Sequence, residues 1–142
     1  MTIEALTPLD VERKLRALVN DLTRAQAELR EARDAEVDAK HAWDRGRRRA
    51  LLSGECPKVT RNGWTTSERD AWVDDQVGDL RFDYDRATVV REAAVDRLRV
   101  LMAQAELVRS LGSQRATSVR LRREGGLMPH SGQPRPRTPP RH

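Results

Sequence analysis

Cys56 is the chain's single cysteine, and it stands in a short polar segment two residues before Lys58. A neighbouring ammonium group lowers the pKa of a thiol and favours the reactive thiolate. Nucleophilic catalysis also needs a positioned base and an oxyanion donor, and nothing in the sequence brings His41 to the cysteine as that base. We therefore expect the protein not to be an enzyme.

Metal and phosphate chemistry also lack a recognisable pattern. The three histidines have no metal-ligand spacing, and the sequence has neither a P-loop nor a G-x-G-x-x-G motif. A group of aspartates would spread around a helix, with no glycine-turned loop to gather them. We expect no metal, cofactor or small-molecule ligand. The residues concerned are His41, His130, His142, Asp74, Asp75, Asp79, Asp83 and Asp85.

A surplus of arginine near the C-terminus is the clearest binding chemistry. Residues 1–112 carry 20 Lys and Arg against 21 Asp and Glu, whereas residues 113–142 carry seven arginines against one glutamate. Residues 113–142 are also rich in proline and glycine and have no apolar period, which predicts a flexible tail, although Thr117–Glu124 could extend a helix. Such a cation binds nucleic acid without reading its sequence. The arginines are Arg115, Arg120, Arg122, Arg123, Arg135, Arg137 and Arg141.

Three other interpretations of this tail stay open: a purely solvating segment, an acidic protein partner, or docking through Pro136–Pro139. A second basic cluster, Arg45, Arg47, Arg48 and Arg49, ends the first predicted helix. It could bind phosphate, with Trp43 or Trp64 stacking on a base. We expect instead that it pairs with a group of aspartates near the start of the second helix. These are Asp70, Asp74, Asp75 and Asp79.

A long helix must position the second basic cluster. Thr7-Pro8-Leu9-Asp10 is a typical helix start, with Thr7 as the cap and Asp10 reaching back to it. A seam of positions alternating by four and three residues follows, interrupted at Glu36 and weakened at Gly46. The seam consists of Val11, Leu15, Leu18, Leu22, Ala25, Leu29, Ala32, Glu36, Ala39, Trp43, Gly46 and Ala50.

The second helix repeats this design. Thr65 and Glu68 predict a capping box, and Gly112 predicts the end of the periodic segment. The seam again alternates by four and three residues. It consists of Val73, Val77, Leu80, Tyr84, Ala87, Arg91, Ala94, Leu98, Leu101, Ala105 and Val108.

The two seams predict an all-α fold, a long antiparallel two-helix coiled-coil hairpin with a disordered basic C-terminal tail. The predicted parts are an arm over 1–7, a helix over 8–53, a turn over 54–65, a helix over 66–111 and a tail over 113–142. Folding the second helix back places together positions whose numbers sum to about 119. Leu22 then faces Leu98, Leu18 faces Leu101, Ala25 faces Ala94, Ala32 faces Ala87, Trp43 faces Val77, and Glu36 falls near Tyr84.

A hairpin of this kind buries one stripe per helix, and alanine layers contribute little buried area. Further apolar residues widen the stripe of the second helix, so we expect a homodimer or a larger helical partner to cover them. The predicted partner interface consists of Trp72, Phe82, Val89, Val90, Val95 and Met102, with Val37, Val100 and Leu107 beside it.

Composition excludes other classes of protein. No run of eighteen apolar residues exists, which argues against a membrane span, and no apolar segment typical of a signal peptide follows Met1. The single cysteine excludes an intramolecular disulfide framework. We therefore expect no membrane span, no secretion by a signal peptide and no membrane partner.

The middle of the chain resembles a known group of proteins. The sequence Asp44–Ala50 is followed after a turn by Thr66–Ala71, Leu80–Tyr84 and Leu98–Leu101. Over roughly residues 30–112 this order resembles small helical-hairpin proteins of phages and prophages of GC-rich Gram-positive bacteria. Some of these are encoded near genes for phage DNA recombination and replication. The resemblance implies a phage origin and a bacterial host cytoplasm, and it carries no catalytic residue.

Two functions of different classes follow. The first is a non-enzymatic phage accessory protein whose basic tail binds nucleic acid in DNA recombination or replication. The alternative is a structural or adaptor coiled coil, such as a scaffold, virion or assembly protein, or an inhibitor of a host factor, acting through protein contact.

Overall fold

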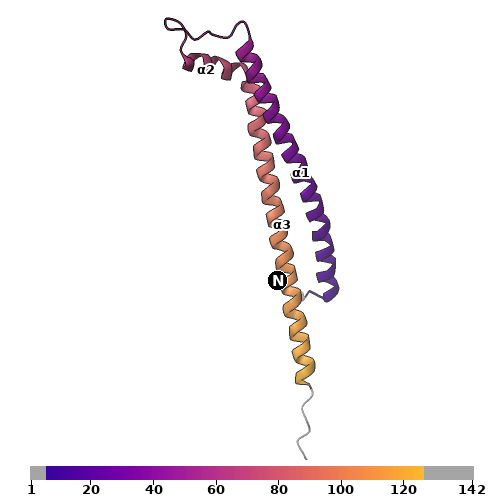
Figure 1. Ribbon diagram of the computed structural model, residues 1–142. Helices are drawn as coiled ribbons and strands as arrows, with labels where there is room; N and C mark the ends of the chain where they lie inside the picture. The colour runs from indigo at the N-terminus through magenta and orange to yellow at the C-terminus, as the bar shows by residue number, and fades with distance from the viewer. Residues whose placement is uncertain (1–5, 127–142) are drawn as a thin grey trace, which may run out of the picture.

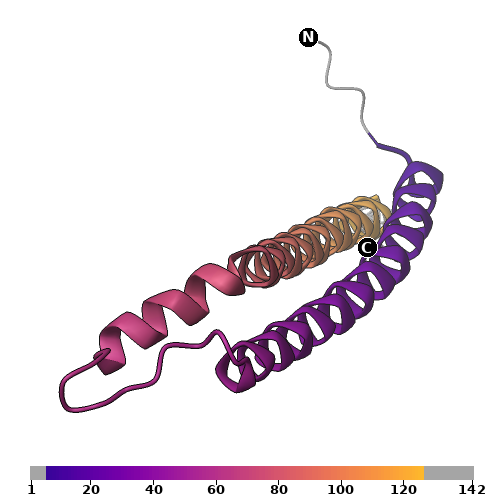
Figure 2. The same ribbon diagram turned by 90° about the horizontal axis from the view of Figure 1, so that it is seen from above.

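The computed structural model describes residues 6–126, which form three helices. They are α1 (Pro8–Leu52), α2 (Thr66–Gln76) and α3 (Gly78–Gly125). α1 and α3 run antiparallel as a long hairpin, and the short α2 lies across its closed end (Figure 1, Figure 2). The prediction of an all-helical antiparallel hairpin is therefore confirmed.

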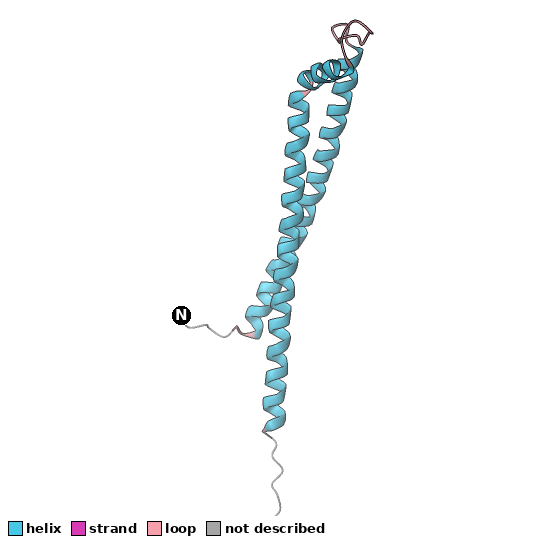
Figure 3. Cartoon of the chain, turned by 90° about the vertical axis from the view of Figure 1, so that its left-hand side faces the viewer, coloured by secondary structure: helices cyan, strands magenta, loops and turns pink. Residues whose placement is uncertain are grey.

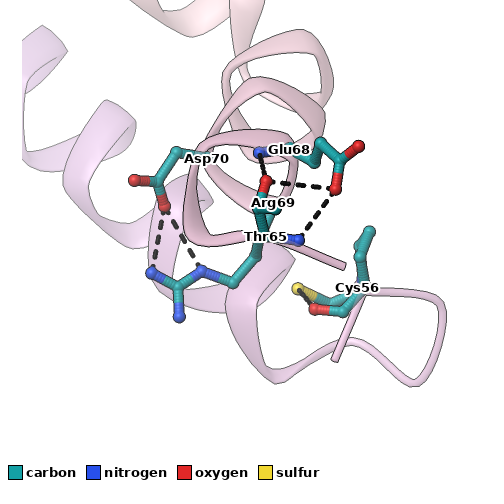
Figure 4. Close-up of polar contacts among 6 residues, drawn as sticks. Cys56, Thr65, Glu68, Arg69 and Asp70 are labelled. Carbon is teal, nitrogen blue, oxygen red and sulfur yellow. Dashed lines mark hydrogen bonds and ion pairs between the residues drawn. The ribbon is translucent and has the colours of Figure 1, made fainter. Parts of the chain in front are cut away.

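Both helix starts that the sequence predicts carry the expected capping boxes. The Asp10 backbone N–H donates to Thr7 Oγ1 at 3.1 Å, and the Thr7 N–H donates to Asp10 Oδ2 at 2.9 Å. In α2 the Glu68 N–H donates to Thr65 Oγ1 at 3.2 Å, and the Thr65 N–H donates to Glu68 Oε2 at 2.8 Å (Figure 4). Each box satisfies N–H groups that have no partner inside a helix.

These contacts predict how the helix starts respond to acid. Hydrogen bonds from the Thr7 hydroxyl and then its N–H lower the pKa of Asp10, and bonds from the Thr65 N–H and then its hydroxyl lower the pKa of Glu68. Their contribution to stability is thus present above the ordinary carboxyl pKa, about 4, and is lost as the pH falls through the lowered values. We expect the protection factors of the backbone N–H groups at both helix starts, relative to an unfolded chain at the same pH, to fall in that window.

Asp10→Asn is the matched control for this prediction. The amide cannot titrate, so the acid-dependent exchange should disappear at the start of α1 and persist at the start of α2. Protection of the Asp10 N–H that does not change with pH in the wild-type chain would contradict the prediction.

Every predicted seam position is buried or half-buried, from Val11 to Ala50 in α1 and from Val73 to Val108 in α2 and α3. The 3.5-residue period therefore identified correctly the faces that the helices pack together. The two polar interruptions of the seams meet each other, because Arg91 Nε donates to Glu36 Oε2 between the helices.

The predicted register is wrong by one to two helical turns. Trp43 stacks on Tyr84, with ring centroids 5.5 Å apart, and not on Val77, and Glu36 pairs with Arg91 and not with Tyr84. Near the termini, a Cβ added to Gly112 would lie 3.2 Å from Val11 Cγ1. These pairs have numbers that sum to between 123 and 127.

A break in the predicted second helix explains the shift. The expected single helix over 66–111 is wrong, because the chain bends at Val77, whose φ is −110° and ψ is 15°. α2 folds over the end of α1 and packs Val73 and Val77 against Ala50. The antiparallel helix thus begins at Gly78, after residues that the seam pattern alone assigns to the hairpin stem.

The expected helix end near Gly112 is also wrong. α3 continues to Gly125, so the predicted tail over 113–142 contains a helical portion, as the alternative for Thr117–Glu124 allowed. Gly112 is half-buried against Val11, where it permits a close approach between helices. The remaining predicted tail, residues 127–142, lies outside the described residues, as does most of the predicted arm.

The hairpin core is shallow. Its fully buried apolar residues are Ala25, Leu29, Ala32, Ala50, Val73 and Val77. α3 contributes none of them along its 48 residues. Within residues 6–126, no helix has an apolar stretch of the length that crossing a bilayer needs.

Candidate nucleic-acid interface

α3 extends past the first residue of α1, and this extension carries the predicted arginines (Figure 1, Figure 3). We call residues 113–125 the overhang. Arg120, Arg122 and Arg123 are exposed there, whereas Arg115 is half-buried. None of these four arginines forms an ion pair with another residue of the described part of the chain. The overhang is therefore a helical cation with one acidic residue, Glu124.

A groove, which we call the notch, lies where α1 begins and α3 continues. Its volume is about 800 Å³. α1 provides Pro8, Val11 and Leu15, and α3 provides Gly112 and the apolar residues that continue its seam. Four arginines border this apolar floor, so the notch offers apolar contact together with positive charge. Its remaining lining residues are Arg109, Arg115, Ala116, Val119, Arg120 and Arg123.

The structure brings together only part of the predicted arginine set. Arg135, Arg137 and Arg141 lie outside the described residues, and so do His130 and His142. The described overhang arginines are on the same helix, but they do not form one row. Seven residues separate Arg115 from Arg122, which places these two on one side, and Arg120 projects from another.

The second basic cluster lies in the last two turns of α1, and all four arginines are exposed. Their predicted pairing with Asp70, Asp74, Asp75 and Asp79 is wrong within the described residues, where no ion pair joins the two groups. α2 turns away from the direction of α3, and Asp70 instead accepts from its neighbour Arg69 at 3.1 Å (Figure 4). The charges of Arg45, Arg47, Arg48 and Arg49 thus remain available to a ligand.

The two tryptophans considered for base stacking are in different environments. Trp43 is half-buried, stacked on Tyr84 and flanked by the guanidinium groups of Arg47 and Arg81 at 5.9 and 6.0 Å. Trp64 in the loop has 53% of its surface exposed. Of these two tryptophans, Trp64 therefore presents the more open aromatic ring.

Cys56 and His41, which were considered for catalysis, lie in different environments. Cys56 packs against the apolar cluster of Ala50, Val73 and Val77, and its thiol faces the Pro57 carbonyl oxygen at 3.8 Å. His41 is exposed on α1. Among the residues that the structure describes, no group of three or more His, Cys, Asp or Glu side chains could hold a metal ion.

The residues predicted to form one partner interface occupy several faces. Trp72 packs against the cluster around Val73, so its assignment to an outer surface is wrong. Val95 is half-buried, whereas Phe82, Val89, Val90 and Met102 are exposed. At about 100° per residue, Phe82 and Val89 share a face of α3, Val90 lies about 80° away from it, and Val95 and Met102 lie nearly opposite, beside the seam with α1.

The sequence interpretation missed the notch, although the signal was present. The spacing of four and three residues continues through Val108, Gly112, Arg115 and Val119, beyond the last position that α1 can cover. A seam that outlasts its partner helix predicts an exposed apolar surface.

Comparisons with known proteins add no relative to these observations, because no protein family, no curated protein and no solved structure matches the chain.

Proposed function

We propose that this chain is a non-enzymatic phage accessory protein that binds nucleic acid without sequence readout during DNA recombination or replication in the host cytoplasm. One observation carries the proposal: the overhang is a cationic helix that projects beyond the hairpin body. Four arginines stand there against one glutamate, without ion pairs inside the described chain.

The chemistry of arginine supports this assignment. The guanidinium group is always charged and matches phosphate oxygens with parallel donors. The helix distributes these donors around its circumference, so they do not form the single row of side chains that a recognition helix presents to base edges. Contacts to phosphate supply affinity without sequence information. Arg135, Arg137 and Arg141 follow in sequence, in a segment without acidic residues.

The second basic cluster is an additional contact in this proposal. Arg45, Arg47, Arg48 and Arg49 lie at the end of α1 that is opposite the overhang, and the loop that follows α1 carries the exposed Trp64. The acidic residues of α2 lower the net charge at that end. We therefore assign the larger share of the affinity to the overhang.

Binding of a labelled DNA duplex of arbitrary sequence tests the proposal, measured by fluorescence anisotropy. Replacing Arg120, Arg122 and Arg123 together with glutamine should weaken binding at least about tenfold at low salt. It should also reduce the slope of log K against log salt by about 0.9 for each phosphate that the variant no longer neutralises. The slope falls because fewer counterions leave the DNA when the variant binds.

A matched control removes the same charge from the hairpin body, by replacing Arg24, Arg30 and Arg33 of α1 with glutamine. These three residues are exposed, and they should contribute little. Equal losses of affinity in both triple variants would mean that only the net charge of the protein matters. That result would contradict a site at the overhang. Wild-type binding that does not change between about 50 and about 200 mM salt would contradict phosphate contact.

One observation favours the adaptor alternative. The notch has an apolar floor of Val11, Leu15 and Val119 bordered by arginines, a combination that fits an acidic amphipathic helix of another protein. If the wild-type chain fails to bind DNA and RNA at low salt, the nucleic-acid proposal is wrong and this second function becomes the better one.

A further inference from the structure

The outer face of α3 carries a second apolar stripe, distinct from its seam with α1. It runs over Phe82, Val89, Val100, Leu107 and Leu111, which are 63%, 64%, 55%, 62% and 45% exposed. Their separations of seven, eleven, seven and four residues return to the same side of a helix. We call these five residues the outer stripe.

A stripe of this length needs a partner more than isolated surface leucines or valines do. It spans thirty residues of α3, about 45 Å at 1.5 Å per residue. α3 has no fully buried residue against α1. The outer face of α1 has no matching stripe, because its large exposed apolar residues between Val11 and Ala50 are Val19 and Val37 alone.

From this pattern we propose that the outer stripe pairs with the outer stripe of a second copy, antiparallel, to form a homodimer with α3 at its centre. The stripe is complementary to itself in that direction. When Phe82 faces Leu107 of the second copy, Val89 faces Val100. Four of the five stripe residues therefore meet one another, and Leu111 falls opposite Gly78 of the second copy.

Arg86, a charged position on the same face, selects the direction. In a parallel pair, Arg86 would face Arg86 of the second copy, which places like charges together. In the antiparallel pair, Arg86 faces Ala103 and lies about 25 Å along the axis from Arg86 of the second copy, whereas Asp96 lies near Asp96 of the second copy in either direction. Beside the stripe, Glu92 comes near Arg99 of the second copy, which adds an opposite-charge pair on each side of the axis.

This arrangement does not rest on nucleic-acid binding, and it extends the proposed function. An antiparallel dimer places one overhang at each end of the assembly. A dimer of this kind would present two separate cationic helices, which suits a protein that holds two nucleic-acid segments apart.

Sedimentation equilibrium at micromolar concentration, without nucleic acid, tests whether the stripe associates. Val100→Asp should weaken the dimer at least about tenfold, because it places a carboxylate against Val89 of the second copy. Val37→Asp is the matched control, since Val37 is 54% exposed on the outer face of α1, and it should leave the dimer intact. A wild-type chain that stays monomeric would overturn the proposal and leave the stripe to another protein.

Disulfide cross-linking in a Cys56→Ser background tests the direction. Val89→Cys mixed with Val100→Cys should form a cross-linked pair containing one copy of each variant. Val89→Cys alone should not cross-link with itself, and Val37→Cys should not cross-link at all. Efficient self-linking of Val89→Cys would overturn the antiparallel arrangement. Both measurements are independent of nucleic acid, so their failure is distinguishable from failure of the proposed function.

Discussion

Replacing Gly46 with leucine is expected to destabilise the hairpin by about 1–3 kcal/mol, because an added side chain overpacks a close contact between α1 and the start of α3. A Cβ at Gly46 would overlap Leu80 Cδ1 and would lie 3.3 Å from Val77 Cγ1. Leu80 is half-buried and Val77 is 3% exposed, so neither side chain moves aside easily. Urea unfolding followed by far-UV circular dichroism measures the change.

Gly78→Leu is the matched control for this prediction. Gly78 begins α3, where an added Cβ meets nothing within 4 Å. Leucine there should be neutral or stabilising by up to about 1 kcal/mol, because glycine is a poor helix former. Equal stability of the two variants would contradict the close packing at Gly46. Gly46→Ala should fall between them, since its gain in helix propensity opposes the overlap with Leu80.

Gly46 illustrates what the sequence could and could not predict. The seam period placed Gly46 on the buried face correctly, but glycine there was interpreted as a weak layer. In the structure, Gly46 is a contact position, because the absence of a side chain there lets Leu80 of α3 come close to α1. A period identifies which face packs, whereas the identity of the opposite residue depends on register.

Register was not predictable because it depends on one backbone bend. Thr65 and Glu68 predicted the start of α2 correctly, and nothing in the helical period marks Val77 as a break. The bend allows Val73 and Val77 to cover the end of α1, a tertiary contact that outweighs the local preference for a continuous helix. Each residue taken up by α2 displaces the pairing of α3 with α1.

The sequence predicts that arginine forms the candidate site, but it does not predict that the arginines lie on a helix. Arginine excess and the scarcity of acidic residues after Gly112 identified the cationic segment. Glycine at position 112 suggested a helix end, and the proline-rich residues that follow suggested a flexible chain throughout. Arg115 and Val119 nevertheless continue the spacing of the seam, and Thr117 Oγ1 and Ser118 Oγ donate back to the carbonyl oxygens of Ser113 and Gln114. The described part of the cationic segment is nevertheless helical as far as Gly125.

Replacing Glu36 and Arg91 together with leucine is expected to stabilise the hairpin, whereas either single replacement destabilises it. The two side chains pair between the seams and are only 21% and 30% exposed. Removing Arg91 leaves Glu36 half-buried and unpaired, and removing Glu36 leaves Arg91 with only the exposed Glu92, 3.9 Å away. Either loss should cost about 1–2 kcal/mol. Removing both replaces a desolvated ion pair with an apolar layer, which should contribute about 1–3 kcal/mol. Unfolding of all four chains gives the coupling energy directly.

The Glu28–Arg97 pair is the matched control, because it joins the same helices but is more exposed, at 41% and 53%. Its coupling energy should stay below about 1 kcal/mol, as for solvated surface pairs. Similar coupling energies for both pairs would contradict the assignment of Glu36 and Arg91 to the seam. Cysteine pairs introduced at facing positions of α1 and α3 would show whether the double leucine variant keeps one register. If this variant is more stable but its cysteine pairs cross-link in several registers, the ion pair serves to select one alignment of two largely alanine-lined helices.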